Sequence, residues 1–131
     1  MPKPAKYNIS LKCFLYFSKW EILILKTPET SSFYGMYDFP WGRIDEDEFE
    51  TDYIEILKRE LFEEAWVENI EIEKKVVAIA RHKAEGKFTS KNIPEYLYYN
   101  FFEAFLSENQ EVKISHEHND FLWVKLDEII L

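Results

Sequence analysis

The sequence predicts a mixed β-sheet with helices packed against it, in the α/β or α+β class. Several segments alternate apolar and polar residues as strands do, one segment carries an apolar stripe at helical spacing, and strands are expected on both sides of it. The 131 residues are expected to form one domain, 1–131, because no repeat, low-complexity tract or linker interrupts them. A chain of this length can bury a core without needing a disulfide or a structural metal.

The first strands are expected near the N-terminus. Residues from Ile9 to Phe17 alternate with period two, which is typical of a strand. Ser18 and Lys19 then suit a hairpin turn, and Trp20 to Leu25 forms the expected partner strand. The segment from Thr27 to Asp38 has the proline, serines and glycine of a loop, and it leads into Phe39-Pro40-Trp41-Gly42.

A helix is predicted to begin after Thr51 or Asp52 and to run to about Glu64. Either residue can act as the N-cap, because a short polar side chain satisfies free backbone N–H groups there. The apolar residues of this segment recur at helical spacing and should pack on the sheet: Ile54, Leu57, Leu61 and Ala65.

The second half of the chain is predicted to return to strands. The expected strands are Glu71 to Arg81, Tyr96 to Leu106, Val112 to Ser115 and Phe121 to Leu126. The aromatic-rich segment from Tyr96 is expected to be buried on both faces, and a polar loop from His82 to Pro94 precedes it. A turn of helix is expected to begin at Asp127.

Charge and composition narrow the function. A formal net charge of −9 argues against a general nucleic-acid or duplex binder, which needs a basic surface, and favours a divalent cation as partner. The single cysteine, Cys13, lies in an alternating apolar stretch and is expected to be a buried thiol. Without a membrane-length segment, export signal or disulfide framework, we expect a cytoplasmic protein that does not bind membranes.

The predicted helix carries three carboxylates whose placement suits a metal. Glu60, Glu63 and Glu64 are three or four residues apart or adjacent, so we expect their carboxylates to project into one small volume. Like charges at that spacing repel, but Mg²⁺ takes carboxylate oxygens together with water and phosphate ligands, which turns the repulsion into affinity. Arg59 can hold one glutamate through a charge-assisted pair. A merely solvated acidic helix face is the alternative interpretation.

Two segments resemble one known family. Gly42-Arg43-Ile44-Asp45-Glu46-Asp47-Glu48, followed by Arg59-Glu60-Leu61-Phe62-Glu63-Glu64 and Val67, resembles the signature of Nudix hydrolases. The segment Ile114 to Val124 is similar to the late strand and preceding loop of these enzymes, notably asymmetric diadenosine tetraphosphate hydrolases. The resemblance implies an α/β/α sandwich with a mixed sheet. It also implies hydrolysis of a pyrophosphate linkage in a nucleoside diphosphate-linked substrate, with dinucleoside polyphosphates as candidates.

The resemblance also implies a set of functional residues. Mg²⁺, with Mn²⁺ as an alternative, would be bound by the carbonyl of Gly42 and by Glu60, Glu63 and Glu64. The catalytic residues would be Glu60, Glu117 and Arg59, and the sequence leaves open whether Glu60 or Glu117 is the general base.

The pattern departs from the family at three places, the first being Trp41-Gly42, where the family usually has a pair of glycines. Ten residues separate Glu48 from Arg59, whereas seven is the common spacing, so we leave Glu48 out of the predicted metal ligands. Trp66 stands where a glycine commonly ends the helix in a left-handed turn, a conformation that costs other residues about 1–2 kcal/mol. We therefore expect the helix to end differently here.

Substrate contacts are expected from basic and aromatic residues. Arg81, Lys83 and Lys87 belong to a basic segment that suits phosphate, although a solvated connector explains it equally well. Tyr37 is a candidate for stacking on a base. A second hypothesis is a catalytically weak or inactive Nudix-fold module that binds a nucleotide or a protein. The oligomeric state stays open, with a homodimer among the alternatives.

Overall fold

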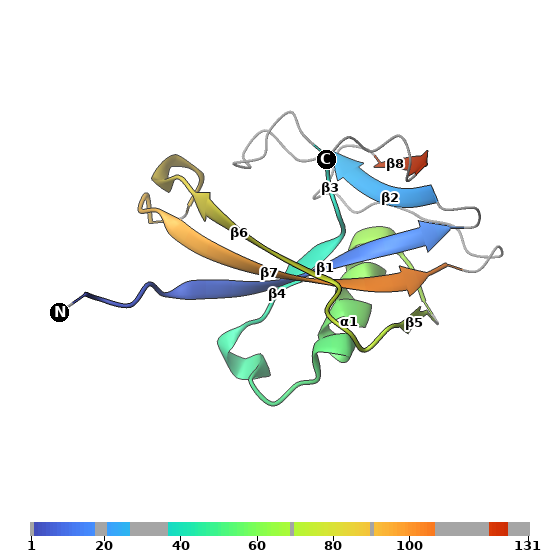
Figure 1. The fold of residues 1–131 in the computed structure, drawn as a ribbon, viewed down its shortest axis with the longest axis horizontal. Helices are drawn as coiled ribbons and strands as arrows, with labels where there is room; N and C mark the ends of the chain where they lie inside the picture. The colour runs from blue at the N-terminus through green and yellow to red at the C-terminus, as the bar shows by residue number, and fades with distance from the viewer. Residues whose placement is uncertain are drawn as a thin grey trace.

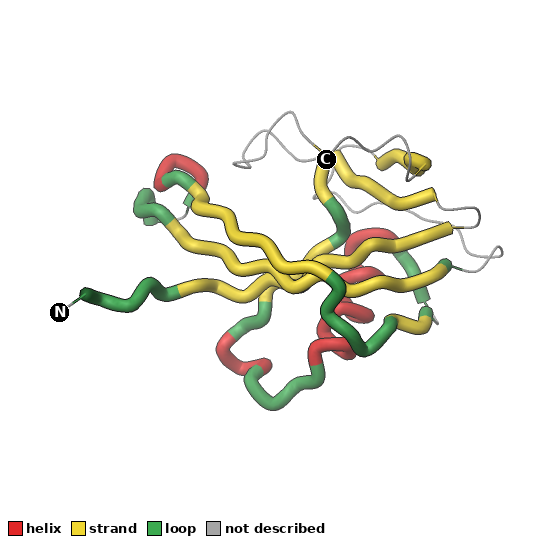
Figure 2. The backbone as a smooth tube through the Cα atoms, in the orientation of Figure 1, coloured by secondary structure: helices red, strands yellow, loops and turns green. Residues whose placement is uncertain are grey.

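The computed structural model describes residues 2–17, 21–26, 37–68, 70–89, 91–106 and 121–125, without the side chains of residues 37, 88, 121 and 122. A twisted sheet dominates this part of the chain, and one α-helix lies against it (Figure 1, Figure 2). The strands are β1 (Tyr7–Phe17), β2 (Glu21–Lys26), β3 (Tyr37–Asp38), β4 (Trp41–Arg43), β5 (Glu71–Ile72), β6 (Ala78–Ala84), β7 (Glu95–Phe105) and β8 (Phe121–Lys125). The helices are α1 (Tyr53–Ala65) and the short 3₁₀ turns η1 (Glu46–Glu48) and η2 (Gly86–Phe88).

The sheet is mixed, as the sequence predicts. Its main path runs β3-β2-β1-β7-β5, and β4 pairs with β1, β6 with β7 and β8 with β2. The long strands β1 and β7 run parallel, whereas the other described pairs are antiparallel. The strands predicted at Ile9–Phe17, Trp20–Leu25 and Phe121–Leu126 are confirmed with small shifts at their ends. The mixed sheet with its packed helix confirms the predicted fold class.

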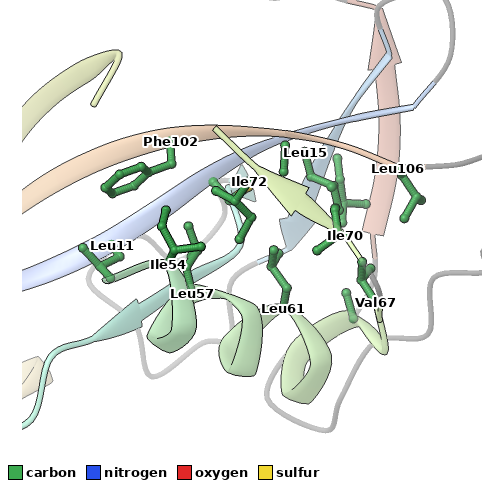
Figure 3. Packing of buried hydrophobic residues seen from close by; sticks show 14 of the residues in the cluster. Leu11, Leu15, Ile54, Leu57, Leu61, Val67, Ile70, Ile72, Phe102 and Leu106 are labelled. Atoms are coloured by element: carbon green, nitrogen blue, oxygen red, sulfur yellow. The ribbon is translucent and has the colours of Figure 1, made fainter. Parts of the chain in front are cut away.

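Helix α1 forms where the apolar stripe predicts it. Asp52 is the N-cap, because its side chain accepts a hydrogen bond from the N–H of Ile54 at 2.8 Å, which decides between Thr51 and Asp52. All four stripe residues are buried and pack with the sheet residues of the main core (Figure 3). Fully burying one leucine contributes about 1.5–3 kcal/mol, so this stripe anchors the helix to the sheet.

The two faces of the sheet have different partners. Alternate residues of β1, among them Leu11, Cys13 and Leu15, point toward α1 and join its core; we call this the helix face. The intervening residues, such as Phe14, point to the opposite face, where a second aromatic cluster includes Tyr99. Cys13 is fully buried, which confirms the expected buried thiol, and burial raises its pKa well above the ordinary range.

The strand predicted from Glu71 to Arg81 is wrong as one element. Ile72 pairs with Ala104 whereas Ala78 pairs with Phe101. The segment from Ile72 to Ala78 therefore advances six residues while β7 advances only three. The three extra residues bulge out between β5 and β6. The reason lies in the sequence, where Lys74-Lys75 and the adjacent Val76-Val77 break the alternation that a continuous strand requires.

Two loops are also shorter than predicted. Strand β6 continues through His82 to Ala84, so the loop expected from His82 begins later and contains η2. Tyr37 and Asp38 form β3 and pair with β2; the remainder of the predicted Thr27–Asp38 loop lies outside the described residues. In both cases pairing with a neighbouring strand overrides local turn propensity.

Strand β7 is buried on both faces only at its centre. Phe101 and Phe102 are both buried, but Tyr96 and Phe105 near the ends are exposed, so the prediction of burial throughout is wrong. The hairpin turn at Ser18-Lys19, the strand Val112–Ser115 and the turn at Asp127 lie outside the described residues. None of the helices in the described ranges is long and apolar enough to cross a membrane.

Candidate active site

Gly42 lies where strand β4 passes the C-terminal half of α1, which carries Glu60 and Glu64. The strand pairs Gly42 with Leu11 of β1, on the helix face of the sheet. A Cβ atom at Gly42 would lie 2.1 Å from Cγ and 2.5 Å from Cδ of Glu60. Carbon atoms that are not bonded to one another cannot approach so closely, so glycine is what allows the Glu60 side chain to lie directly against the strand.

Glu64, one helical turn after Glu60, also reaches β4. Its side chain is buried, and its Oε2 accepts a hydrogen bond from the N–H of Trp41 at 3.3 Å. The hydrogen bond partly offsets the cost of burying a carboxylate. Glu60 and Glu64 therefore approach the same short strand from one face of the helix.

Arg59 connects the helix to the loop before it. Its Nη1 donates to Oε2 of Glu48 at 2.6 Å, and its Nη2 donates to Oε1 of Glu60 at 3.1 Å. These bonds raise the pKa of Arg59, and the bond from Arg59 holds the pKa of Glu48 below its ordinary value. Arg59 thus links Glu60 to Glu48 and holds the Glu60 carboxylate close to Gly42.

Glu48 is a residue that sequence reasoning set aside. Its side chain is buried, its Oε1 accepts from the N–H of Asp45 at 3.1 Å, and its Oε2 binds Arg59. Single carboxylate oxygens of Asp45, Asp47 and Glu48 lie within 4.8 Å of one another, a grouping that could hold a metal ion. The motif match identified Glu48, but the longer spacing hid its contact with Arg59.

Glu60, Glu63 and Glu64 do not converge as closely as expected. Taken as a trio, they are not among the described groups of three acidic side chains whose carboxylate oxygens all lie within 4.8 Å of one another. Glu63 has a side chain 56% exposed and only a long contact of 3.9 Å to Nε of Arg59. Adjacent helical positions point about 100° apart, so Glu63 and Glu64 diverge while Glu60 stays beside both.

Comparison with known proteins decides the family. A model of the NUDIX domain matches residues 6–131, which is nearly the whole chain. The chain belongs to the Nudix family. It is accordingly a Nudix-type nucleotide pyrophosphohydrolase, acting on nucleoside diphosphate derivatives. No curated protein sequence matches the chain.

Solved structures of Nudix proteins share the fold. A MutT protein from Methanosarcina mazei Go1 superposes with a TM-score of 0.73 at 23% identity, covering 96% of this chain and 82% of that one. An Ap4A hydrolase from C. elegans, in a binary complex, gives 0.60 at 23% identity and covers 92% and 81%. The E. coli dihydroneopterin triphosphate pyrophosphohydrolase gives 0.67 at 14% identity and covers 91% and 82%. At these identities the likeness establishes the fold.

The residues of the Nudix signature fit a divalent cation. Nudix enzymes generally use divalent metals. Here Glu60 and Glu64 supply carboxylate oxygens, which are ligands that Mg²⁺ and Mn²⁺ prefer, and the space beside Gly42 lets Glu60 approach the strand backbone. Buried carboxylates carry a large desolvation cost, and a cation would compensate the charge of Glu64.

The Nudix helix ends in a left-handed turn although its capping residue is tryptophan. Trp66 has φ 60° and ψ 27°, and its N–H donates to the carbonyl of Phe62 at 2.9 Å. The N–H of Val67 bonds to the carbonyl of Leu61 at 3.3 Å, which completes the cap. The expectation that the helix would end differently is wrong: the cap survives, and Trp66 carries the backbone strain.

A buried ion pair on the opposite face was missed by sequence reasoning. Nζ of Lys12 lies 2.6 Å from both carboxylate oxygens of Asp38 and 4.3 Å from the ring centre of Tyr99. Burial lowers the pKa of Lys12, against the opposing attraction of Asp38 and Glu64. Burial and nearby Lys12 also lower the pKa of His82. The available signal was a single lysine within an apolar strand.

The remaining predicted site residues are distributed over several elements. Arg81 and Lys83 are exposed on β6, not in a loop, and Lys87 is exposed in η2. The backbone of Tyr37 belongs to β3, whereas its side chain lies outside the described part of the chain. Glu117 also lies outside the described residues. The structure therefore brings together Gly42, Glu48 and the helix residues Arg59, Glu60 and Glu64.

Proposed function

We propose that the protein is a Mg²⁺-dependent hydrolase that cleaves a pyrophosphate linkage in a nucleoside diphosphate-linked substrate, with dinucleoside polyphosphates as a candidate class. The observation that carries the proposal is the position of Glu60, which lies against Gly42 and accepts a hydrogen bond from Arg59. A solvated acidic helix face has no need for a glycine cradle or a buried Glu64.

Within this proposal, Glu60 and Glu64 bind the cation together with the carbonyl of Gly42, and Glu63 contributes from the solvent side. A bound Mg²⁺ neutralises phosphate charge and lowers the pKa of a coordinated water. Arg59 holds the Glu60 carboxylate in place through a charge-assisted hydrogen bond, and both a ligand and a base require such positioning.

The proton of the attacking water passes to a carboxylate, either Glu60 or Glu117. The phosphates of the substrate are bound by Arg81, Lys83 and Lys87, and Tyr37 stacks on a base. These contacts are supported by charge and ring chemistry and by the location of Arg81 and Lys83 on an exposed strand.

Release of phosphate-containing products from a panel of nucleoside diphosphate derivatives, with and without Mg²⁺, tests the proposal. Glu60→Gln and Glu64→Gln keep the shape of the side chains but remove the charges, so we expect metal-dependent kcat/KM to fall about a hundredfold or more. Glu55→Gln is the matched control, since Glu55 is exposed on the same helix and pairs with Lys58 at 3.8 Å; its rate should equal the wild-type rate.

The outcomes separate the two hypotheses for this chain. Wild-type protein that binds a nucleotide yet shows no metal-dependent turnover on any member of the panel would support the inactive binding module instead. Equal rates for wild type, Glu60→Gln and Glu64→Gln would remove both glutamates from the mechanism. Glu117→Gln, assayed beside Glu60→Gln across pH, identifies the base as the variant that loses the acidic limb of the rate profile.

A further inference from the structure

Three strands present tyrosines and cations together on the helix face of the sheet, beyond the area that α1 covers. Strands β1 and β7 pair Tyr7 with Tyr96, and strands β7 and β6 pair Tyr96 with Lys83 and Tyr98 with Arg81. Directly paired residues of neighbouring strands point to the same face. We call Tyr7, Tyr96, Tyr98, Arg81 and Lys83 the tyrosine platform. Its strands extend away from α1 toward the N-terminus (Figure 1).

The rings of the platform are packed and yet open to solvent. The ring centres of Tyr7 and Tyr96 lie 5.8 Å apart, and those of Tyr7 and Tyr98 lie 6.4 Å apart in an edge-to-face arrangement. Nζ of Lys83 lies 5.7 Å from the ring centre of Tyr96. Tyr7 and Tyr96 are 40% and 39% exposed. Rings that are already fixed and partly exposed lose little entropy when a flat group stacks on them.

The charge of the platform is opposite to that of the whole protein. Arg81 and Lys83 are exposed, and neither takes part in the ion pairs recorded among the described residues. The described residues of β1, β6 and β7 that share this face include no aspartate or glutamate. A basic and aromatic area on a chain of net charge −9 suits a ligand that combines phosphates with an aromatic base.

The platform continues directly from the candidate active site. The N–H of Ile44, two residues after Gly42, donates to the carbonyl of Ile9 at 3.0 Å, and Ile9 lies on β1 between Tyr7 and Leu11. Tyr7 is four residues from Leu11, the partner of Gly42, which corresponds to about 13 Å along a strand. A second nucleoside joined through phosphates can cover that distance.

We propose that the tyrosine platform binds a second nucleoside of the substrate, with Tyr96 stacking on its base and Arg81 and Lys83 binding the phosphates that lead to it. The proposal rests on the proposed function, and it narrows the substrate to nucleoside diphosphates whose linked group carries another nucleotide. A second copy of the chain is a poorer occupant, because a two-fold contact centred here would place Arg81 and Lys83 against the same cations.

The test compares substrates that share the hydrolysed diphosphate. One carries a sugar beyond it, one carries a second nucleoside as in a dinucleoside polyphosphate, and one is an oligonucleotide with a 5′-diphosphate. Tyr96→Ala and Lys83→Gln should raise KM about tenfold more for a substrate with a second nucleotide than for the sugar-linked one, with kcat little changed. The controls are Phe105→Ala, an exposed ring on the other face of β7, and Lys125→Gln, an exposed lysine on β8; both should behave as wild type.

Each result either supports or contradicts the binding of a second nucleoside by the tyrosine platform. A rise in KM confined to the oligonucleotide identifies the longer substrate, and a rise with both shows that one further nucleoside suffices. Equal changes in KM for all three substrates, or none, would overturn the proposal. Failure of the proposed function is distinguishable, because it abolishes turnover of the sugar-linked substrate too. In that event, the affinity of a fluorescent dinucleoside polyphosphate in EDTA still tests the platform, and unchanged affinity in Tyr96→Ala would refute it.

Discussion

Substituting alanine for Gly42 tests the geometry on which the metal site depends. The new Cβ would lie 2.1 Å from Cγ of Glu60, whereas carbon atoms in contact are separated by about 3.5–4.0 Å. The Glu60 side chain therefore has to move by roughly 1.5 Å. Because a misplacement of about 1 Å can cost on the order of a hundredfold in rate, we expect kcat/KM to fall about a hundredfold, equivalent to roughly 2.7 kcal/mol.

Stability should change much less than activity in Gly42→Ala. The Glu60 side chain is 19% exposed and can turn toward solvent, so the loss in the free energy of unfolding should be about 1 kcal/mol. A double-mutant cycle isolates the contact: in a Glu60→Ala background the clash is absent, and Gly42→Ala should then have little effect on urea denaturation. Initial rates over a Mg²⁺ titration provide the functional measurement, and a higher Mg²⁺ requirement is expected for the single variant.

Gly86→Ala is the matched control for this substitution. Its Cβ would lie 2.7 Å from the backbone oxygen of Asn92, so it should lower stability, but it lies in η2 and should leave the Mg²⁺ dependence unchanged. If Gly42→Ala retained the wild-type rate and the wild-type Mg²⁺ dependence, Glu60 would not need its place against β4, and the reasoning for the metal site would be refuted.

Three further predictions concern the surroundings of the site. Trp66→Gly should be more stable than Trp66→Ala by about 1 kcal/mol in free energy of unfolding, measured by urea denaturation, because glycine adopts φ 60° without strain. Equal stabilities of the two variants would contradict this prediction. Glu48 has a lowered pKa, so its stabilising charge is present above its ordinary value of 4.5 and lost as pH falls through the lower folded value. Wild type should therefore melt at a higher temperature than Glu48→Gln at neutral pH, and this difference should disappear in acid. A difference that does not change with pH would show that the hydrogen bond to Arg59 is not its cause. Lys12→Met leaves Asp38, whose side chain is only 12% exposed, without its cation and should lower the free energy of unfolding by about 3–5 kcal/mol, part of which Asp38→Asn restores; a loss below about 1 kcal/mol would contradict the pairing.

The elements that the sequence predicts well are those whose pattern is local. The stripe of α1 and the alternation of β1 need only periodicity, and both are found as expected. Prediction failed where pairing overrides the pattern. Residues 73–77 lie between two strand-like segments and break their alternation, but only the register of β7 shows that three residues bulge out there. Strand β4 is too short to show a period, yet it carries Gly42.

In the candidate active site, too, local sequence patterns predict some features and miss the contacts between distant residues. The signature gives Arg59, Glu60 and Glu64 by sequence spacing, but spacing gives neither the exposed position of Glu63 nor the bond between Arg59 and Glu48. The ion pair of Lys12 with Asp38 joins residues 26 apart in sequence. A contact of that kind depends on the register of three strands, which no local pattern encodes.

The three additional residues before α1 illustrate why spacing is a weak guide to distance in this site. Phe49, Glu50 and Thr51 are exposed, and they lie between Glu48, which bonds Arg59, and the N-cap Asp52. Lengthening a surface loop in this way costs only a few tenths of a kcal/mol, so the Glu48–Arg59 contact survives it. Deleting Phe49–Thr51 should therefore keep Mg²⁺-dependent kcat/KM within about threefold of wild type and change the free energy of unfolding by less than about 1 kcal/mol. A loss of activity in the deletion that matches Glu48→Gln would show instead that these residues are needed to bring Glu48 to Arg59.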